Sequence, residues 1–146
     1  MTRWPEARPV PDASAYTLAK FIFEEIICRH GTPKILLSDQ GQNFISEITR
    51  LLCEKFLIKH KFSSPYHPQT NGIVERFNCT LVESLAKVKE NDDWDLHIPA
   101  VLLAYRTKKH ATTGFTPFQL VYRRQTTLPI EAILLVEPKE EIKIDL

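Results

Sequence analysis

A short apolar run, Ile35-Leu36-Leu37, ends abruptly in the polar residues SDQG at 38–41. A buried strand that leads into a polar loop has this pattern, so we predict a strand here with Asp39 at its carboxyl end. Residues 58–62 alternate apolar and basic side chains, which is the period of a half-exposed strand. Residues 6–10 could form a short edge strand between the prolines. The sequence therefore predicts a sheet of short strands.

Helical spacing of apolar residues occupies much of the remaining chain, and residues 63–71, which contain Pro65 and Pro68, are predicted to form a loop. The expected helices are 13–29 with Asp12 as the N-cap, 46–56 with Ser46 as the N-cap, a long helix starting at 71–72, 94–108 behind Asp92 or Asp93, and a short final helix from Thr116-Pro117.

The charge of the chain is balanced overall but not locally. Nineteen Lys and Arg face 18 Asp and Glu, and a net charge of +1 gives no global reason to bind nucleic acid or an anionic membrane. No acidic residue lies between Asp95 and Glu131, whereas five basic residues do. This favours an anionic partner near residues 94–108, with a solvated helix face as the alternative. The basic residues are Arg106, Lys108, Lys109, Arg123 and Arg124.

The sequence argues against a membrane protein and against a disulfide framework. No apolar stretch approaches the roughly 18 residues of a membrane span, and the N-terminus has no apolar signal region. We therefore expect an intracellular protein, nuclear or cytoplasmic. Cys28, Cys53 and Cys79 are odd in number and form no CxxC pair, so we expect buried free thiols.

Two carboxylates stand out. Asp39 ends a predicted strand, and Glu75, which follows after 35 intervening residues, lies one turn into a predicted helix. Hard oxygen ligands on separate rigid elements suit Mg²⁺ or Mn²⁺. A structural interpretation is also open, because Asp is common in strand-to-loop turns and Glu suits the first turn of a helix.

The chain resembles the integrase catalytic core of gypsy-type long-terminal-repeat retrotransposons and retroviruses. The resemblance runs from residue 2 to about 135. It rests on the segments TRWPEA at 2–7, CRHGTP at 28–33, SDQGQNF at 38–44, PYHPQTNGIVERFN at 65–78, AYRT at 104–107 and TGFTPFQLVY at 113–122.

The resemblance implies an α/β, ribonuclease H-like fold, a mixed sheet flanked by helices, here incomplete and lacking the first two strands. Residues 1–135 would form a partial catalytic core, with 136–146 as a C-terminal tail. Asp39 and Glu75 match two of the family's three catalytic, metal-binding carboxylates, which bind two Mg²⁺ or Mn²⁺ ions. The family's first Asp would lie upstream of the TRWPEA segment, and Asp12 fits a helix cap better than a replacement.

The resemblance also implies DNA partners, both element ends and target DNA, and self-association as a homo-oligomer. His67, Gln69 and Asn71 would lie in a loop beside the DNA end, with helix capping as an equal alternative for Asn71. Arg76 and Asn78 follow Glu75 on its helix, and Arg106, Lys108 and Lys109 would extend the basic surface. Arg123 stands where the family usually has Gly at a helix end.

Three functions remain open at this point. The chain could be a retrotransposon integrase fragment that is inactive alone, because one catalytic carboxylate is absent. It could instead be a non-catalytic DNA-binding or dimerisation module derived from an integrase, for which the basic residues and an exposed Trp94 argue. It could also be an active enzyme completed by another chain.

Overall fold

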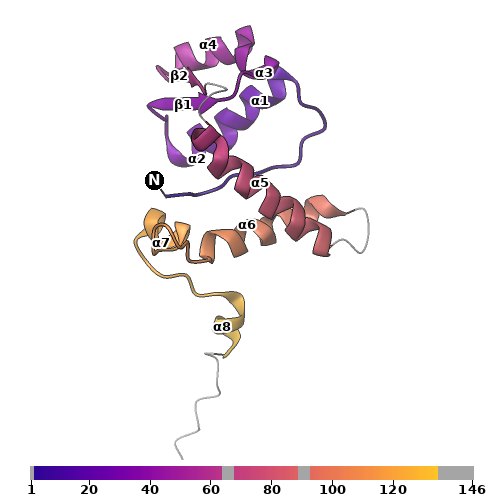
Figure 1. Ribbon diagram of the computed structural model, residues 1–146, viewed down its shortest axis with the longest axis vertical. Helices are drawn as coiled ribbons and strands as arrows, with labels where there is room; N and C mark the ends of the chain where they lie inside the picture. Colours follow the sequence, from indigo (N-terminus) through magenta and orange to yellow (C-terminus); the bar gives the residue numbers. More distant parts are fainter. Residues whose placement is uncertain (1, 64–67, 89–92, 135–146) are drawn as a thin grey trace, which may run out of the picture.

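The computed structural model describes residues 2–63, 68–88 and 93–134; for 68–71 and 88 it describes the backbone alone. Helices and strands fall into two groups with their main contacts inside each group. The first half, residues 12–63, holds the sheet and the helices packed on it, and the second half, residues 68–88 and 93–134, is helical (Figure 1). Residues 2–8, which we call the bridge segment, run between the halves (Figure 1).

The first half opens with the predicted helix, which continues from α1 (Ala15–Phe21) through a π-helical stretch (Ile22–Ile27) into α2 (Cys28–His30). Gly31, at φ 82°, ends it, as the Gly-then-Pro signal predicts. Asp12 is not the N-cap. Ser14 caps the helix through its bond from the Thr17 amide, and Asp12 accepts from the Ser14 amide and the Thr17 hydroxyl, both at 2.8 Å.

Two parallel strands form the sheet. β1 (Ile35–Ser38) pairs with β2 (Lys59–Phe62) in the register that sets Ile35 opposite Lys59 and Ser38 opposite Phe62. Parallel strands require a crossover, which α3 (Gln42–Ile45) and α4 (Glu47–Lys55) supply. Ser46 caps α4 by accepting from the Thr49 amide. Both strands and this cap lie where the sequence predicts them, but the expectation that residues 35–37 form a buried strand is wrong, because Ile35 and Leu37 are exposed.

The edge strand predicted at residues 6–10 is wrong, because the segment pairs with neither strand and has no regular structure. Pro5 and Pro9 lack backbone donors, and the side chains of Glu6 and Arg8 bond to side chains of the helices instead. In the described residues the sheet therefore has two strands.

The second half begins with α5 (Pro68–Val88), which starts at Pro68 rather than at Asn71-Gly72. Pro is tolerated in a first helical turn, so Pro68 opens the helix, and the predicted loop was too long. A 3₁₀ turn (Trp94–His97) leads into α6 (Ile98–Thr107), and Phe77, Ile98 and Leu102 form a buried core between α5 and α6. None of the described helices is long and apolar enough to cross a membrane.

The chain continues through α7 (Pro117–Tyr122) into α8 (Pro129–Leu134). Thr116 and Gln119 form a reciprocal capping box at the start of α7, as the Thr-Pro signal predicts. α7 is not the final helix, because α8 follows it with Ile130, Ile133 and Leu134 all exposed. The expected tail, 136–146, lies outside the described residues.

The bridge segment joins the halves through the carboxylate of Glu6. Its Oε1 accepts from Trp4 Nε1 at 2.9 Å and from His30 Nε2 at 2.7 Å, and its Oε2 accepts from Arg29 at 3.1 Å and Arg106 at 2.7 Å. The side chain is 5% exposed. Arg29 and His30 belong to the first half and Arg106 to the second, so one buried carboxylate holds both.

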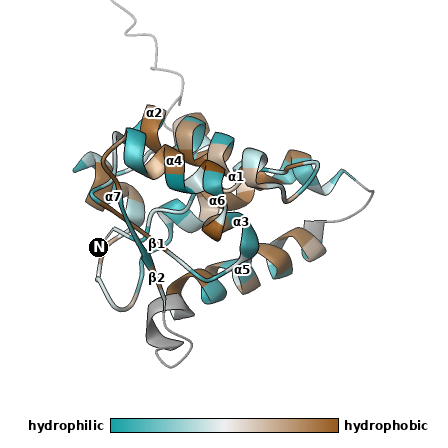
Figure 2. Ribbon diagram, turned by 90° about the horizontal axis from the view of Figure 1, so that it is seen from above, coloured by the Kyte–Doolittle hydropathy of each residue, from teal (hydrophilic) through white to brown (hydrophobic). Residues whose placement is uncertain are grey.

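Much apolar surface stays uncovered. Twenty large apolar or aromatic side chains in the described residues are exposed, among them Ile35 and Leu37 of β1. Apolar and polar residues alternate along α5 in Figure 2. The three cysteines divide as well: Cys53 is buried, as expected, whereas Cys28 and Cys79 are exposed, which corrects the prediction of three buried thiols.

Arg123 occupies a left-handed conformation at the end of α7, with φ 56° and ψ 26°. A Cβ is strained there, so Arg123→Gly should raise the free energy of unfolding by roughly 0.5–1 kcal/mol. Urea unfolding of both chains measures the change. Arg123→Ala, which keeps the Cβ, serves as the control, and a Gly variant no more stable than the Ala variant would contradict the prediction.

The pKa of Glu6 is lowered from its ordinary 4.5: burial alone would raise it, but the bonds from His30 and Trp4 and the charges of Arg106 and Arg29 outweigh burial. A depressed pKa stabilises the fold above pH 4.5, and this contribution is lost as the pH falls through the folded pKa. Glu6→Gln should therefore cost about 2 kcal/mol at pH 7 and less in acid.

Urea unfolding of the parent chain and of Glu6→Gln, measured at several pH values from about 7 down to about 3.5, gives this difference in the free energy of unfolding. The lower limit lies about one unit below the ordinary pKa of a glutamate. Glu47→Gln, which removes an exposed ion pair to Arg50, is the matched control and should change little at any pH. A Glu6→Gln effect of constant size would refute the assignment.

Candidate metal centre and nucleic-acid interface

Asp39 directly follows β1, as the sequence predicts, and its side chain is exposed. Oδ1 accepts from the Gly41 amide at 2.9 Å, and Oδ2 has no hydrogen-bond partner in the described residues. A Cβ at position 41 would lie 3.0 Å from Oδ1, so glycine allows this close approach. The turn therefore fixes one oxygen and leaves the other open to a ligand.

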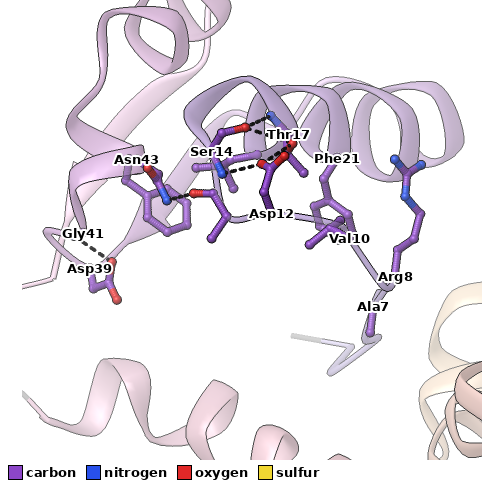
Figure 3. Close-up of a pocket in the computed structure, with 13 residues that line it drawn as sticks. Ala7, Arg8, Val10, Asp12, Ser14, Thr17, Phe21, Asp39, Gly41 and Asn43 are labelled. Atoms are coloured by element: carbon purple, nitrogen blue, oxygen red, sulfur yellow. Dashed lines mark hydrogen bonds between the residues drawn. The ribbon is translucent and has the colours of Figure 1, made fainter. Parts of the chain in front are cut away.

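The Asp39 carboxylate lies at the edge of a cavity of about 430 Å³ between the bridge segment, α1 and the β1–α3 turn (Figure 3). Ala7, Val10, Phe21 and Phe44 give it largely apolar walls. Asp12 also lines it, but the bonds from Ser14 and Thr17, which lower the pKa of Asp12, commit that carboxylate to the start of α1. Asp12 thus supports the start of α1 by bonding to its N-cap, Ser14, and to Thr17, rather than by being the N-cap itself.

A hydrogen-bonded relay fixes the backbone at Asp39. The hydroxyl of Ser38 donates to the Asp39 carbonyl at 2.8 Å, and because it has one hydrogen, His60 Nε2, 2.9 Å away, must donate to it. The amide of Ser63 donates to the Ser38 carbonyl at 2.7 Å, and this bond continues the pairing of the two strands past the end of β2. Burial lowers the pKa of His60, so its imidazole is neutral near pH 7.

Sequence reasoning missed this relay. The alternation over 58–62 does place His60 on the same face as Ile58 and Phe62, and that face packs towards α4. A histidine on the same face of the strand as Ile58 was the available signal. The partner, however, depends on the register, which the alternation alone leaves undetermined.

Glu75 lies on α5 with its side chain exposed and without an ion pair among the described residues. Asp39 and Glu75 belong to different halves, and no contact joins them directly. Within the described part of the chain, no three His, Cys, Asp or Glu residues gather as a set of metal ligands. Among the described residues, Asp39 and Glu75 are thus two exposed carboxylates on separate elements, which the structure does not gather into a set of metal ligands.

The other predicted residues of this region differ in how far the structure describes them. His67 lies outside the described residues, as do the side chains of Gln69 and Asn71. Asn71 lies inside α5 and is not its N-cap, which corrects that alternative. Arg76 and Asn78 are exposed, and Arg76 Nε donates to the Gly72 carbonyl at 2.9 Å.

The basic residues at the end of α6 and just after it divide into two groups. Lys108 and Lys109 are exposed, as a nucleic-acid contact requires. The side chain of Arg106 is instead 14% exposed. Its guanidinium bonds to Glu6 and to the Pro5 carbonyl and lies 4.3 Å from the centre of the Trp4 ring. This placement argues against the predicted contact between Arg106 and nucleic acid, because the Nε and Nη2 groups donate inside the protein.

Comparison with known proteins supports the resemblance seen in the sequence. Residues 1–68 match the family model described as "Integrase core domain". The retrovirus-related Pol polyprotein from transposon 412 of Drosophila melanogaster is 33% identical over 131 residues, which are 88% of this chain and 11% of that polyprotein. The Gag-Pol polyprotein of feline leukemia virus is 37% identical over 122 residues, which are 82% of this chain and 7% of that polyprotein.

Solved structures agree with the sequence matches. The catalytic core domain of BIV integrase superposes with a TM-score of 0.70 at 27% identity, covering 84% of this chain and 80% of that one. A chain of the simian T-cell lymphotropic virus intasome in complex with PP2A regulatory subunit B56 gamma superposes with a TM-score of 0.68 at 22% identity. The match covers 82% of this chain and 44% of that one, and it shows similarity of fold alone. The expected ribonuclease H-like class is thus confirmed, here with a small parallel sheet.

Proposed function

This chain carries an integrase core domain, and on that premise we propose that it is part of a retroelement integrase in which Asp39 and Glu75 bind divalent metal beside DNA. The observation that supports this most is the open Asp39 carboxylate, held by the Gly41 amide at the end of β1. The chain spans 11% and 7% of the two polyproteins it matches, so activity, substrate and partners of a whole integrase are proposals for it.

The donor set fits Mg²⁺ or Mn²⁺. These hard cations take carboxylate oxygens and retain water molecules, and Asp39 and Glu75 both present exposed carboxylates without competing cations among the described residues. When bound, such ions activate the attacking oxygen and stabilise the leaving oxygen at a phosphodiester. The task of this chain's own residues is to orient Asp39, which the relay through Ser38 and His60 does.

We further propose that these 146 residues alone do not trim or join DNA ends. Two of three family carboxylates have counterparts here, and a centre with two ligands holds metal less firmly than a complete one. Residues 1–135 then act as a partial catalytic core.

The proposed DNA contacts are Lys108, Lys109, Arg76 and Asn78, which are exposed, together with His67, Gln69 and Asn71. Cationic side chains supply affinity for phosphates, and amide groups suit contacts with bases and phosphates. Arg106 is left out for the reason given above. The partners would be element ends and target DNA, bound by a homo-oligomer.

A non-catalytic DNA-binding or dimerisation module is the second candidate. The exposed side chain of Trp94, 45% accessible, next to the exposed Leu96 favours it, because an apolar pair on the surface suits a protein contact. Metal-independent DNA binding by a chain that binds no Mn²⁺ would favour this candidate over the metal centre.

Metal binding tests the first proposal. Asp39→Asn and Glu75→Gln should each weaken Mn²⁺ binding by about tenfold or more, because each removes one charged ligand, and isothermal titration measures the affinity. Asp95→Asn and Glu83→Gln, which change exposed carboxyl groups elsewhere, are matched controls, and Glu83 lies on the same helix as Glu75. Equal losses in the controls would show non-specific binding.

DNA binding tests the interface. Lys108→Ala and Lys109→Ala should each weaken the binding of duplex DNA. Each should also reduce the slope of log affinity against log salt concentration by about 1, because one phosphate contact is lost. Lys34→Ala removes an exposed lysine from the first half and is the control. Fluorescence anisotropy at several salt concentrations measures both quantities, and an unchanged salt slope in the Lys108 and Lys109 variants would contradict the assignment.

A further inference from the structure

We propose that Glu6 is a positioning residue that sets the half carrying Glu75 against the half carrying Asp39. The inference rests on the proposed function, in which the two carboxylates bind the same metal centre. Asp39 follows β1 in the first half, and Glu75 lies on α5 in the second. Whatever fixes the two halves also fixes the spacing of the two ligands.

Glu6 contacts both halves through its two carboxylate oxygens. His30 and Arg29, at the end of α2, bond to Oε1 at 2.7 Å and to Oε2 at 3.1 Å, and Arg106 of α6 bonds to Oε2 at 2.7 Å. The Glu6 side chain is 5% exposed, so its carboxylate depends on these protein donors more than on water. Charge-assisted bonds of this kind are directional, so the carboxylate determines how α2 and α6 lie relative to each other.

The residues on either side of Glu6 extend the connection. The ring of Trp4 lies edge-on to Tyr122, with centroids 5.5 Å apart, and edge-on to His30 at 6.4 Å, so it also touches both halves. Ala7 packs against the core cluster that contains Phe77, two residues after Glu75 on α5. The bridge segment thus reaches the helix that bears the proposed ligand.

Removal of the Glu6 charge should loosen this alignment and leave each half with its own core. The first half retains the sheet and α4, and the second retains the cluster of Phe77, Ile98 and Leu102. The ligand spacing would then vary, and the two carboxylates would no longer meet one ion.

Two native cysteines allow a direct measurement. Cys28 on α2 and Cys79 on α5 are exposed, one in each half, whereas Cys53 is buried and should not react. Spin labels on Cys28 and Cys79 report the distance between the halves by double electron–electron resonance. We expect a narrow distance distribution in the parent chain, a broad one in Glu6→Gln, and no change in the control Glu47→Gln. A distribution as narrow in Glu6→Gln as in the parent would overturn the proposal.

Mn²⁺ affinity separates positioning from a general loss of stability. Glu6→Gln should lower the affinity about tenfold, and adding Glu6→Gln to Glu75→Gln should cause no further loss, because the second ligand is already missing. Losses that multiply would overturn the positioning role.

Two further outcomes are decisive as well. If Glu6→Gln fails to fold, Arg29→Gln, which removes the partly exposed first-half partner, must broaden the same distribution, and an unchanged distribution would overturn the proposal. If the parent chain binds no Mn²⁺, the proposed function fails, and the distance measurement alone decides whether Glu6 aligns the halves.

Discussion

The buried carboxylate of Glu6 bonds to side chains from both halves of this chain. Glu6 accepts from four donors, and three of them come from α2 and α6, which lie far apart in the sequence. The main contacts between helices and strands lie within each half, so the bridge segment carries much of the connection between them. Such a connection is strong only while every donor is present, because an unpaired buried charge is costly.

The functional proposal depends on the same arrangement. The paired ends of β1 and β2 place Asp39 through Ser38, His60 and Ser63, and this local geometry needs nothing from the second half. Glu75, in contrast, reaches its position through α5, whose core packs against Ala7 of the bridge segment. One proposed ligand is thus fixed by strand pairing and the other by the bridge.

Local patterns predicted local structure well. Strand alternation, helical spacing and caps such as Ser46 and Thr116 depend on neighbours in the sequence, and they located β1, β2, α4 and α7. Position 39 at the strand end followed from the same reasoning. The resemblance to integrases added the fold class, which the solved structures confirm.

The sequence-based predictions were least accurate for residues whose partners are distant in the chain. The sequence around Arg106 contains no acidic partner, which suggested an unpaired cation. Its partner in the structure, Glu6, lies 100 positions away in the chain. Residues 6–10 were predicted as an edge strand, but side chains of this segment bond to helices and the segment pairs with no strand. The error at Pro68 has a local cause: the residue was assigned to a loop, whereas proline fits the first turn of a helix, and α5 begins there.

The central claim is that Asp39 and Glu75 bind one divalent ion together. Paramagnetic broadening of backbone amide resonances by substoichiometric Mn²⁺ tests it most directly, because broadening falls steeply with distance from the ion. The account predicts that the amides of Gly41 and Arg76, which are close in sequence to the two ligands, broaden together in one titration. Broadening at only one of them, or at neither, would contradict it.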